Sequence, residues 1–254
     1  LAGAQGVDWL ICNLDADEAF VCGGPAGECF ASVPENVLEL QLLNHEAVPE
    51  SAEDAADYFR GCTLFKRSPY LLGSKKEAFM KFWGDRAASV GAKLAYRELG
   101  DTTWKRGGGA LELYFTGYSH GKAAVRVGPC RAHDIVPLGP HRWDLVASAT
   151  ARVKTADACI LHYNNCEGAA GLARRYSGRR GESWNQLRMH TLCQALHGKN
   201  PDALGDLLAS GLLATEGDAR EVEAQIKAGV LLRIKTVQKA CQDWNGSCAG
   251  QGTV

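Results

Sequence analysis

A short stretch near the start of the chain, DWLICNLDADEAFV at residues 8–21, constrains the fold most strongly. An apolar run typical of a buried strand (WLI) leads into Asp15 and Asp17, with Glu18 directly behind. Burying an ionised carboxylate is costly unless the group is paired, hydrogen-bonded or bound to a metal. If the strand continued, acids two residues apart would project to one side and repel each other. A divalent cation removes this repulsion, and hard oxygen ligands suit Mg2+ or Mn2+; the alternative is a strand that ends in a solvated acidic turn.

The composition indicates a globular protein of one large or two ordinary domains. The chain has 254 residues, of which 46% are apolar and 22% charged. Its formal net charge of -1 gives no field for nucleic acid or an anionic membrane. It contains no apolar run of about 18 residues and no signal peptide. Because the chain begins without a Met and reaches a strand after only a few residues, we expect a piece of a longer protein whose localisation signals lie upstream.

Ten cysteines are many for a cytosolic protein, and they are scattered without a C-x-x-C pair. A secretory lumen with some disulfides would explain them, and so would a role as small buried hydrophobes. Pairs such as Cys159-x-x-His162 lack the second pair that a structural zinc site needs.

Three segments have the patterns of strands. NVLELQLLNHE at 36–46 alternates Leu with Glu and Gln, which is typical of a strand with period two. GCTLFKRS at 61–68 is a shorter candidate, and DACILHY at 157–163 is an apolar strand that ends on His162. The segment at 110–127 reads as a hairpin that closes with GKAAVRV.

Helical patterns dominate the second part of the chain. Ser74 and Glu77 form a capping-box pattern at the start of one helix, and helices are expected from about residue 182 onward. We therefore predict an α/β chain with a sheet-containing portion at 1–180 and a helical extension at 181–254. One longer helix is expected to present a packing stripe made of Val222, Ile226, Val230, Ile234, Val237 and Cys241.

The candidate chemistry lies where two predicted strands end. One leads to Asp15 and Asp17, and the other ends on His162; two carboxylates and an imidazole can hold a divalent metal with positions left open for phosphate oxygens. Alone, such a histidine is more often a hydrogen-bonded structural residue. Arg179 and Arg180 follow in an Arg-rich turn, and they suit bidentate phosphate recognition or a solvated surface.

The order of these motifs resembles that of plant and algal glycosyltransferases related to family 92 and to the family 2-like proteins. Individually the motifs are short, and their order across residues 9–234 carries the resemblance. The matched pieces are a D-x-D-E motif at 15–18, an N-Y-E-S-like segment in LNHEAVPE, an MFKK-like piece at 64–66, a GKSAARV-like segment at 121–127, a GAHRW-like motif at 139–143, an LHY strand at 161–163 and a KGILTRI-like tail at 228–234.

This resemblance implies a GT-A-like mixed sheet that binds a nucleotide sugar, most simply a UDP-sugar, through Mn2+ or Mg2+. By the same resemblance, Asp17 would bind the metal, Asp15 would contact the ribose or share the metal, and His162 would be the C-terminal metal ligand. Arg126, Arg179 and Arg180 are the candidates for the donor phosphates. The β-α-β half that cradles the base in such domains should precede the D-x-D, so the chain resembles the acceptor-side portion.

The implied reaction is transfer of a sugar to a glycan or other acceptor with inversion, which requires a general base. Glu46 is the candidate, since it follows the period-two strand in the N-x-E segment, and His141 is the alternative. The resemblance also implies a membrane-anchored enzyme facing the Golgi lumen, with the cytoplasm as the alternative. The segments CGGPAGEC and RGGGA, and the turn after HYNN, depart from the family pattern, so acceptor recognition is expected to differ.

Two competing functions remain open. One is a catalytically silent GT-A-like domain that binds glycan or a partner protein. The other is a different D-x-D enzyme, such as a nucleotidyltransferase or phosphohydrolase, which would normally carry further acids near the first pair.

Overall fold

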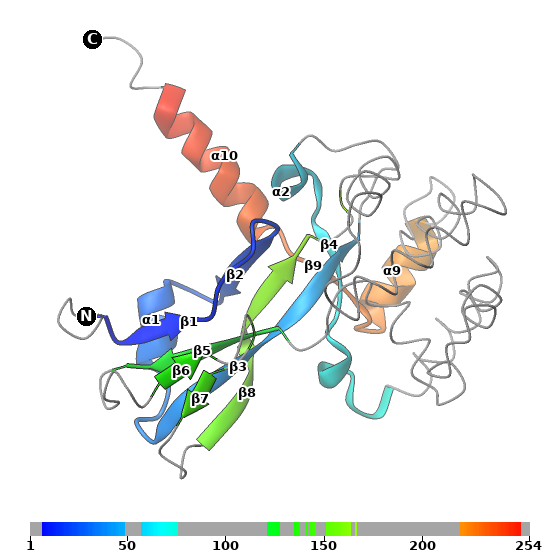
Figure 1. Cartoon of the computed structure of the whole chain (residues 1–254). Helices are drawn as coiled ribbons and strands as arrows, with labels where there is room; N and C mark the ends of the chain where they lie inside the picture. Colours follow the sequence, from blue (N-terminus) through cyan, green and yellow to red (C-terminus); the bar gives the residue numbers. More distant parts are fainter. Residues whose placement is uncertain are drawn as a thin grey trace, which may run out of the picture. The chain divides into compact units, whose positions relative to one another are not determined.

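The computed structural model describes residues 7–48, 57–75, 121–127, 135–137, 141, 143–145, 151–163, 166 and 219–249. Over these residues the protein is a mixed α/β structure, in which seven strands form one open antiparallel sheet beside a few helices (Figure 1). The predicted α/β class is confirmed at this level. The sequence predicted a mixed sheet, whereas every pairing with a defined register is antiparallel. Alternation of apolar residues indicates that a strand exists but leaves its direction open.

The strands of this sheet come from distant parts of the chain. The main path runs in the order β1-β5-β3-β4-β9, and β8 pairs with both β2 and β3. A separate two-stranded ladder is formed by β6 and β7. The strands are β1 (Trp9–Ile11), β2 (Glu18–Cys22), β3 (Val37–Val48), β4 (Leu64–Lys66), β5 (Lys122–Arg126), β6 (Ile135–Pro137), β7 (Trp143–Leu145), β8 (Ala151–His162) and β9 (Leu231–Arg233).

The chain divides into two compact units. The first contains Leu1–His45 and Ser119–His162, and the second contains Glu46–Tyr118 and Tyr163–Val254. The residues of β3 up to His45 belong to the first unit and the rest of that strand to the second. The predicted boundary at residue 180 lies outside the described residues.

The core of the first unit forms where β3, β5 and β8 bring apolar side chains together. The predicted strands at 36–46 and 157–163 are confirmed as parts of β3 and β8. Strict alternation in β3 was wrong, because Glu39 is 1% exposed although it was expected on the polar face. The buried cluster consists of Val37, Leu40, Leu42, Ala124, Ala158 and Ile160.

The helix α1 (Ala26–Ala31) covers part of this core, where the sequence indicated only a loop. It begins after Pro25, whose φ of -56° already suits a helix start. Phe30 of α1 stacks on Trp9 and Phe20 with ring centroids 5.3 and 5.5 Å apart. These contacts tie the helix to the strands on either side of the acidic turn.

The second unit corrects the prediction of one long helix across residues 222–241. The chain there forms α9 (Ala219–Lys227), then β9, then α10 (Thr236–Ala249). Gly229, with φ +73°, ends α9, and the Val230 amide donates to the Gln225 carbonyl, as in a Schellman C-cap. The apolar residues that follow pair with β4, so tertiary pairing interrupts the helical pattern.

Side chains from several segments complete the second unit. Tyr163 contacts the rings of Tyr58, Phe59 and Phe65. The helix α10 meets α2 (Tyr58–Gly61) through the Gln238 side-chain amide, which donates to the Arg60 carbonyl at 2.8 Å. Two 3-10 turns, η2 (Pro69–Leu71) and η3 (Gly73–Lys75), follow β4. The helix expected to continue from Ser74 lies outside the described residues.

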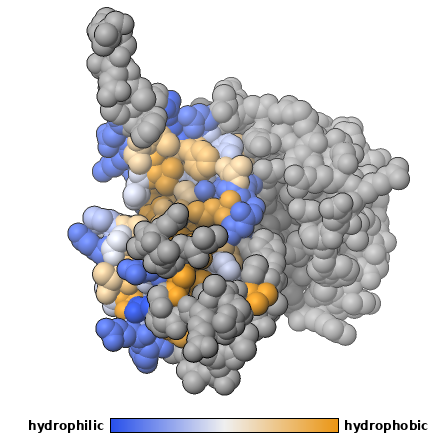
Figure 2. Space-filling model, turned by 60° about the vertical axis from the view of Figure 1, so that its left-hand side comes forward, coloured by the Kyte–Doolittle hydropathy of each residue, from blue (hydrophilic) through white to orange (hydrophobic). Residues whose placement is uncertain are grey.

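Hydrophobic side chains also reach the surface, and Figure 2 shows them on one face between hydrophilic ones. Leu14, which lies among the acids of the turn, is 40% exposed. Among the described residues, no helix has the length and apolar character needed to cross a bilayer.

Candidate functional site

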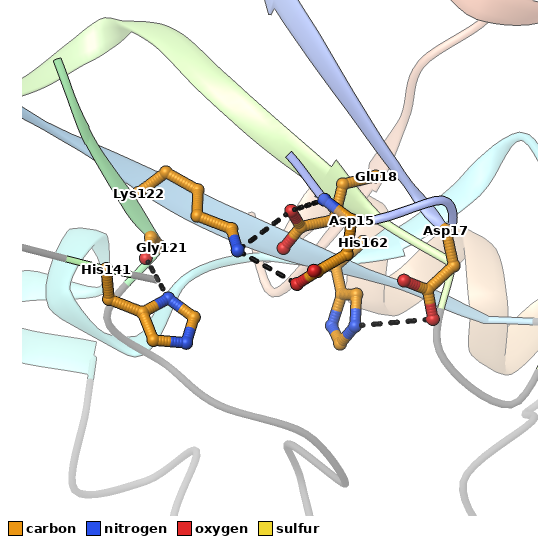
Figure 3. A network of polar contacts seen from close by, with 7 residues as sticks. All are labelled: Asp15, Asp17, Glu18, Gly121, Lys122, His141 and His162. Atoms are coloured by element: carbon orange, nitrogen blue, oxygen red, sulfur yellow. Dashed lines mark hydrogen bonds and ion pairs between the residues drawn. The ribbon is translucent and has the colours of Figure 1, made fainter. Parts of the chain in front are cut away.

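The acids of the D-x-D-E motif lie in a closed turn between β1 and β2. The strand β1 ends at Ile11, so the acids do not continue it. The Glu18 amide donates to the Asp15 carbonyl at 3.0 Å, and the Asp15 amide donates to Glu18 Oε2 at 2.8 Å. Because the turn reverses the chain, Asp15 and Asp17 point toward different partners (Figure 3). The repulsion expected for a continuing strand is thereby avoided.

Asp17 faces His162 across a short gap. His162 is the last residue of β8 and pairs in register with Glu18, the first residue of β2. This pairing places the imidazole beside the turn, with His162 Nε2 3.9 Å from Asp17 Oδ2. The Asp17 and His162 side chains are 15% and 8% exposed. Two metal-capable groups from distant segments therefore meet in the first unit.

Asp15 has a different partner, Lys122, which the sequence argument did not single out. Lys122 is the first residue of β5, and its Nζ lies 2.9 Å from Asp15 Oδ2 and 3.2 Å from Glu18 Oε2. The Lys122 and Glu18 side chains are fully buried, whereas the Asp15 side chain is 47% exposed. A lysine that opens an otherwise apolar strand was the available signal, since a buried ammonium requires acidic partners.

Glu18 has the most deeply buried side chain of the three acids. Burial raises the pKa of its carboxyl, and the Asp15 amide and Lys122 ammonium offset this only in part. Its Oε2 receives both of those donors, whereas Oε1 is buried without a hydrogen-bond partner among the described residues. The carboxylate thus has one satisfied oxygen directed at the turn and one enclosed in the protein.

The same region contains side chains of the kinds that bind metal ions. Among the described residues, no three His, Cys, Asp or Glu side chains are grouped as a ready metal site. Asp17 and His162 nevertheless supply an oxygen and a nitrogen from opposite sides of one short gap. One or two protein ligands completed by substrate phosphates and water are typical of Mg2+ sites. The residues present therefore fit a divalent ion that is shared with a phosphorylated ligand.

His141 lies beside the start of β5. Its Nδ1 is 3.1 Å from the Gly121 carbonyl oxygen, and this oxygen can only accept, so Nδ1 carries the hydrogen. In a neutral ring the lone pair would then lie on Nε2, and Figure 3 shows that nitrogen directed away from Gly121. An imidazole in this tautomer can accept a proton.

Glu46, the other predicted base, belongs to the second unit. It pairs in register with Lys66, and Lys66 Nζ lies 3.6 Å from Glu46 Oε2. The Glu46 side chain is 1% exposed. Burial lowers the pKa of Lys66, and the Glu46 carboxylate offsets part of that effect. Glu46 thus lies in a buried ion pair, and its assignment as the base stays a prediction.

Of the three arginines predicted to bind phosphate, only Arg126 lies among the described residues. The Arg126 guanidinium donates to the Val33 and Pro34 carbonyls at 2.8 and 3.2 Å and lies 4.8 Å from the centre of the Trp9 ring. These contacts join β5 to the segment before β3. Arg179 and Arg180 lie outside the described residues.

No protein-family model matches the chain, and no curated protein or solved structure matches it significantly.

Proposed function

We propose that this chain is part of a metal-dependent glycosyltransferase that moves a sugar from a nucleotide-sugar donor to a glycan or similar acceptor, with inversion. The observation that carries the proposal is the meeting of Asp17 and His162, 3.9 Å apart, at the junction of the acidic turn with the end of β8. The order of motifs along the sequence supports a GT-A-like domain around this junction. A UDP-sugar is the donor we expect.

The Asp17 carboxylate and the His162 imidazole would hold the ion, Mn2+ or Mg2+. When bound, such an ion offsets the negative charge that develops on the leaving diphosphate. The two side chains are mostly buried, which limits competition from water. The turn hydrogen bonds between Asp15 and Glu18 keep Asp17 directed toward His162.

The base has two candidates with different surroundings. His141 lies with Nδ1 3.1 Å from the Gly121 carbonyl oxygen, so a neutral ring with its hydrogen on Nδ1 would have the lone pair on Nε2 that a base needs. Glu46 lies in a buried ion pair with Lys66, at 3.6 Å. His141→Ala and Glu46→Gln distinguish them, because loss of the base lowers kcat by ~100-fold or more while leaving donor affinity nearly unchanged.

A catalytically silent binding domain is the second candidate function. The observation that favours it is Lys122, whose ammonium already neutralises acids of the D-x-D-E motif without any added ion. This alternative predicts that the protein does not bind Mn2+. The glycosyltransferase proposal predicts that the protein binds Mn2+ and releases UDP from at least one donor.

The deciding experiment uses the full-length protein. Free Mn2+ is measured by EPR during titration, and UDP release is then measured with a panel of UDP-hexoses and UDP-pentoses in the presence of Mn2+. Asp17→Asn and His162→Ala should each lower the Mn2+ affinity and the rate of UDP release by ~100-fold or more, because each removes a ligand. Asp8→Asn, which alters an exposed acid of the same unit, is the matched control and should leave the Mn2+ affinity and the rate of UDP release unchanged. Absence of Mn2+ binding by the wild type would refute the proposal.

We also propose a Golgi lumenal location, which the thiol chemistry of the chain can test. Among the residues whose side chains are described, all seven cysteines are free thiols. A disulfide in protein isolated from its native compartment would therefore involve cysteines outside that set, and a full set of free thiols would favour the cytoplasm.

A further inference from the structure

The acidic turn contacts a buried lysine, Lys122, whose ammonium lies between two of its acids. Lys122 Nζ bridges Asp15 Oδ2 and Glu18 Oε2 at 2.9 and 3.2 Å, and Figure 3 shows its side chain reaching across to both acids. The Asp15 amide donates to the same Glu18 oxygen, so one small network joins the two acids, the turn backbone and β5. Asp17 lies on the other side of the turn, facing His162.

The backbone fixes where this ammonium can lie. Lys122 pairs in register with Leu42 of β3, in the interior of the sheet. Gly121 before it has φ +69°, and a Cβ at that position would collide with the Leu42 carbonyl oxygen. The His141 imidazole is hydrogen-bonded to the Gly121 carbonyl. The lysine therefore leaves the sheet at a defined point, with its side chain fully buried.

Separating the buried ammonium from either of its two carboxylates is energetically unfavourable. Removing one partner from a buried ion pair leaves an uncompensated charge, which is strongly unfavourable. Asp15 and Glu18 are thus already engaged before any ion arrives. A divalent ion at this turn has Asp17 and His162 as the groups whose positions suit coordination.

We propose that Lys122 is a positioning residue that keeps Asp15 out of the metal's ligand set. This inference rests on the proposed function. Lys122 holds the turn closed, so that Asp17 faces His162 and, among the described residues, these two side chains supply the ligands. Phosphate oxygens of the donor complete the coordination, so Mn2+ binds more tightly together with UDP than alone.

The test measures Mn2+ affinity by EPR on the full-length protein, with and without UDP. Asp15→Asn is the key variant, because its amide oxygen can still accept from Lys122 while its charge is lost. We expect it to change Mn2+ affinity by less than ~3-fold, whereas Asp17→Asn and His162→Ala reduce the affinity by ~100-fold or more. UDP should increase the affinity of the wild type by at least ~10-fold.

A second pair of variants tests the lysine itself. In a Lys122→Met background Asp15 is released, so adding Asp15→Asn should now lower Mn2+ affinity by ~10-fold or more. Circular dichroism checks that both variants fold; if Lys122→Met does not fold, the comparison of Asp15→Asn with Asp17→Asn decides alone. An Asp15→Asn loss as large as that of Asp17→Asn overturns this inference and leaves the proposed function intact. Absence of Mn2+ binding by the wild type overturns both.

Discussion

Replacing Gly121 by Ala should cost more stability than any other glycine substitution that the described structure allows to be assessed. Gly121 has φ +69°, a left-handed conformation that costs a residue with a Cβ about 1–2 kcal/mol. The added Cβ would also collide with the Leu42 carbonyl oxygen and lie 2.9 Å from the Asn44 nitrogen. Both are backbone atoms of β3, so no side-chain rotation relieves the contact.

The second part of the cost follows from the pairing of β3 with β5. Relief requires β5 to move away from β3 where Lys122 pairs with Leu42. Losing about two backbone hydrogen bonds there costs on the order of 2 kcal/mol, since each contributes about 1 kcal/mol net. Together with the conformational term, the free energy of unfolding should fall by about 3–4 kcal/mol.

Urea unfolding followed by circular dichroism measures this difference, and two other glycines separate its parts. Gly73 has φ +56° with nothing within 4 Å of the point that a Cβ would occupy, so Gly73→Ala should show only the conformational cost of about 1–2 kcal/mol. Gly23 also has open space and lacks a positive φ, so Gly23→Ala should change little. If Gly121→Ala lowers the free energy of unfolding no more than Gly73→Ala does, β3 and β5 do not approach each other as closely at this point as described.

Two further predictions concern buried groups away from the turn. Because burial lowers the pKa of Lys66 below 10.5, the folded chain binds fewer protons than the unfolded chain between the lowered value and 10.5. The urea stability of the wild type relative to Lys66→Met should thus rise with pH in that range, and a fall would contradict the assignment. Burial also raises the pKa of Cys159 to about 12, so at pH 8 its thiolate fraction is ~1,000-fold below that of a thiol with the ordinary value of 9.0. Mass spectrometry after iodoacetamide treatment should find Cys159 unmodified in the folded protein and modified in urea; equal labelling in both would show that the thiol is not buried as described.

Local patterns were sufficient to predict the strands that frame the site. Period-two alternation identified β3, and a short apolar run identified the end of β8 at His162. The sequence predicted that Asp15, Asp17 and His162 converge on one ion because the acids and the histidine follow apolar strands. The register between β2 and β8 brings Asp17 to His162, whereas Asp15 contacts Lys122. Strand β2 itself was missed, because five residues directly after the acids carry too short a pattern to stand out.

Long-range pairing accounts for the parts that the sequence did not reveal. Lys122 is 107 residues from Asp15, and nothing local to either indicates their contact. The helix predicted across residues 222–241 was wrong because the residues between Val230 and Ile234 of its apolar stripe form β9 and pair with β4. Periodicity reports which side chains are buried, whereas the identity of the partner depends on the fold.

The charges at the turn connect the structure with the proposed chemistry. Three acids in four residues carry three formal negative charges, and Lys122 supplies one buried positive charge that serves both Asp15 and Glu18. Among the described residues, the formal negative charges of these three acids exceed the single positive charge of Lys122 by two, the charge that one divalent ion carries. A second lysine would neutralise the turn further and weaken its attraction for such an ion, whereas with no lysine Asp15 and Glu18 would compete with Asp17 for it. A single buried ammonium, that of Lys122, can thus hold the turn closed and leave Asp17 and His162 as the groups that would bind a divalent ion.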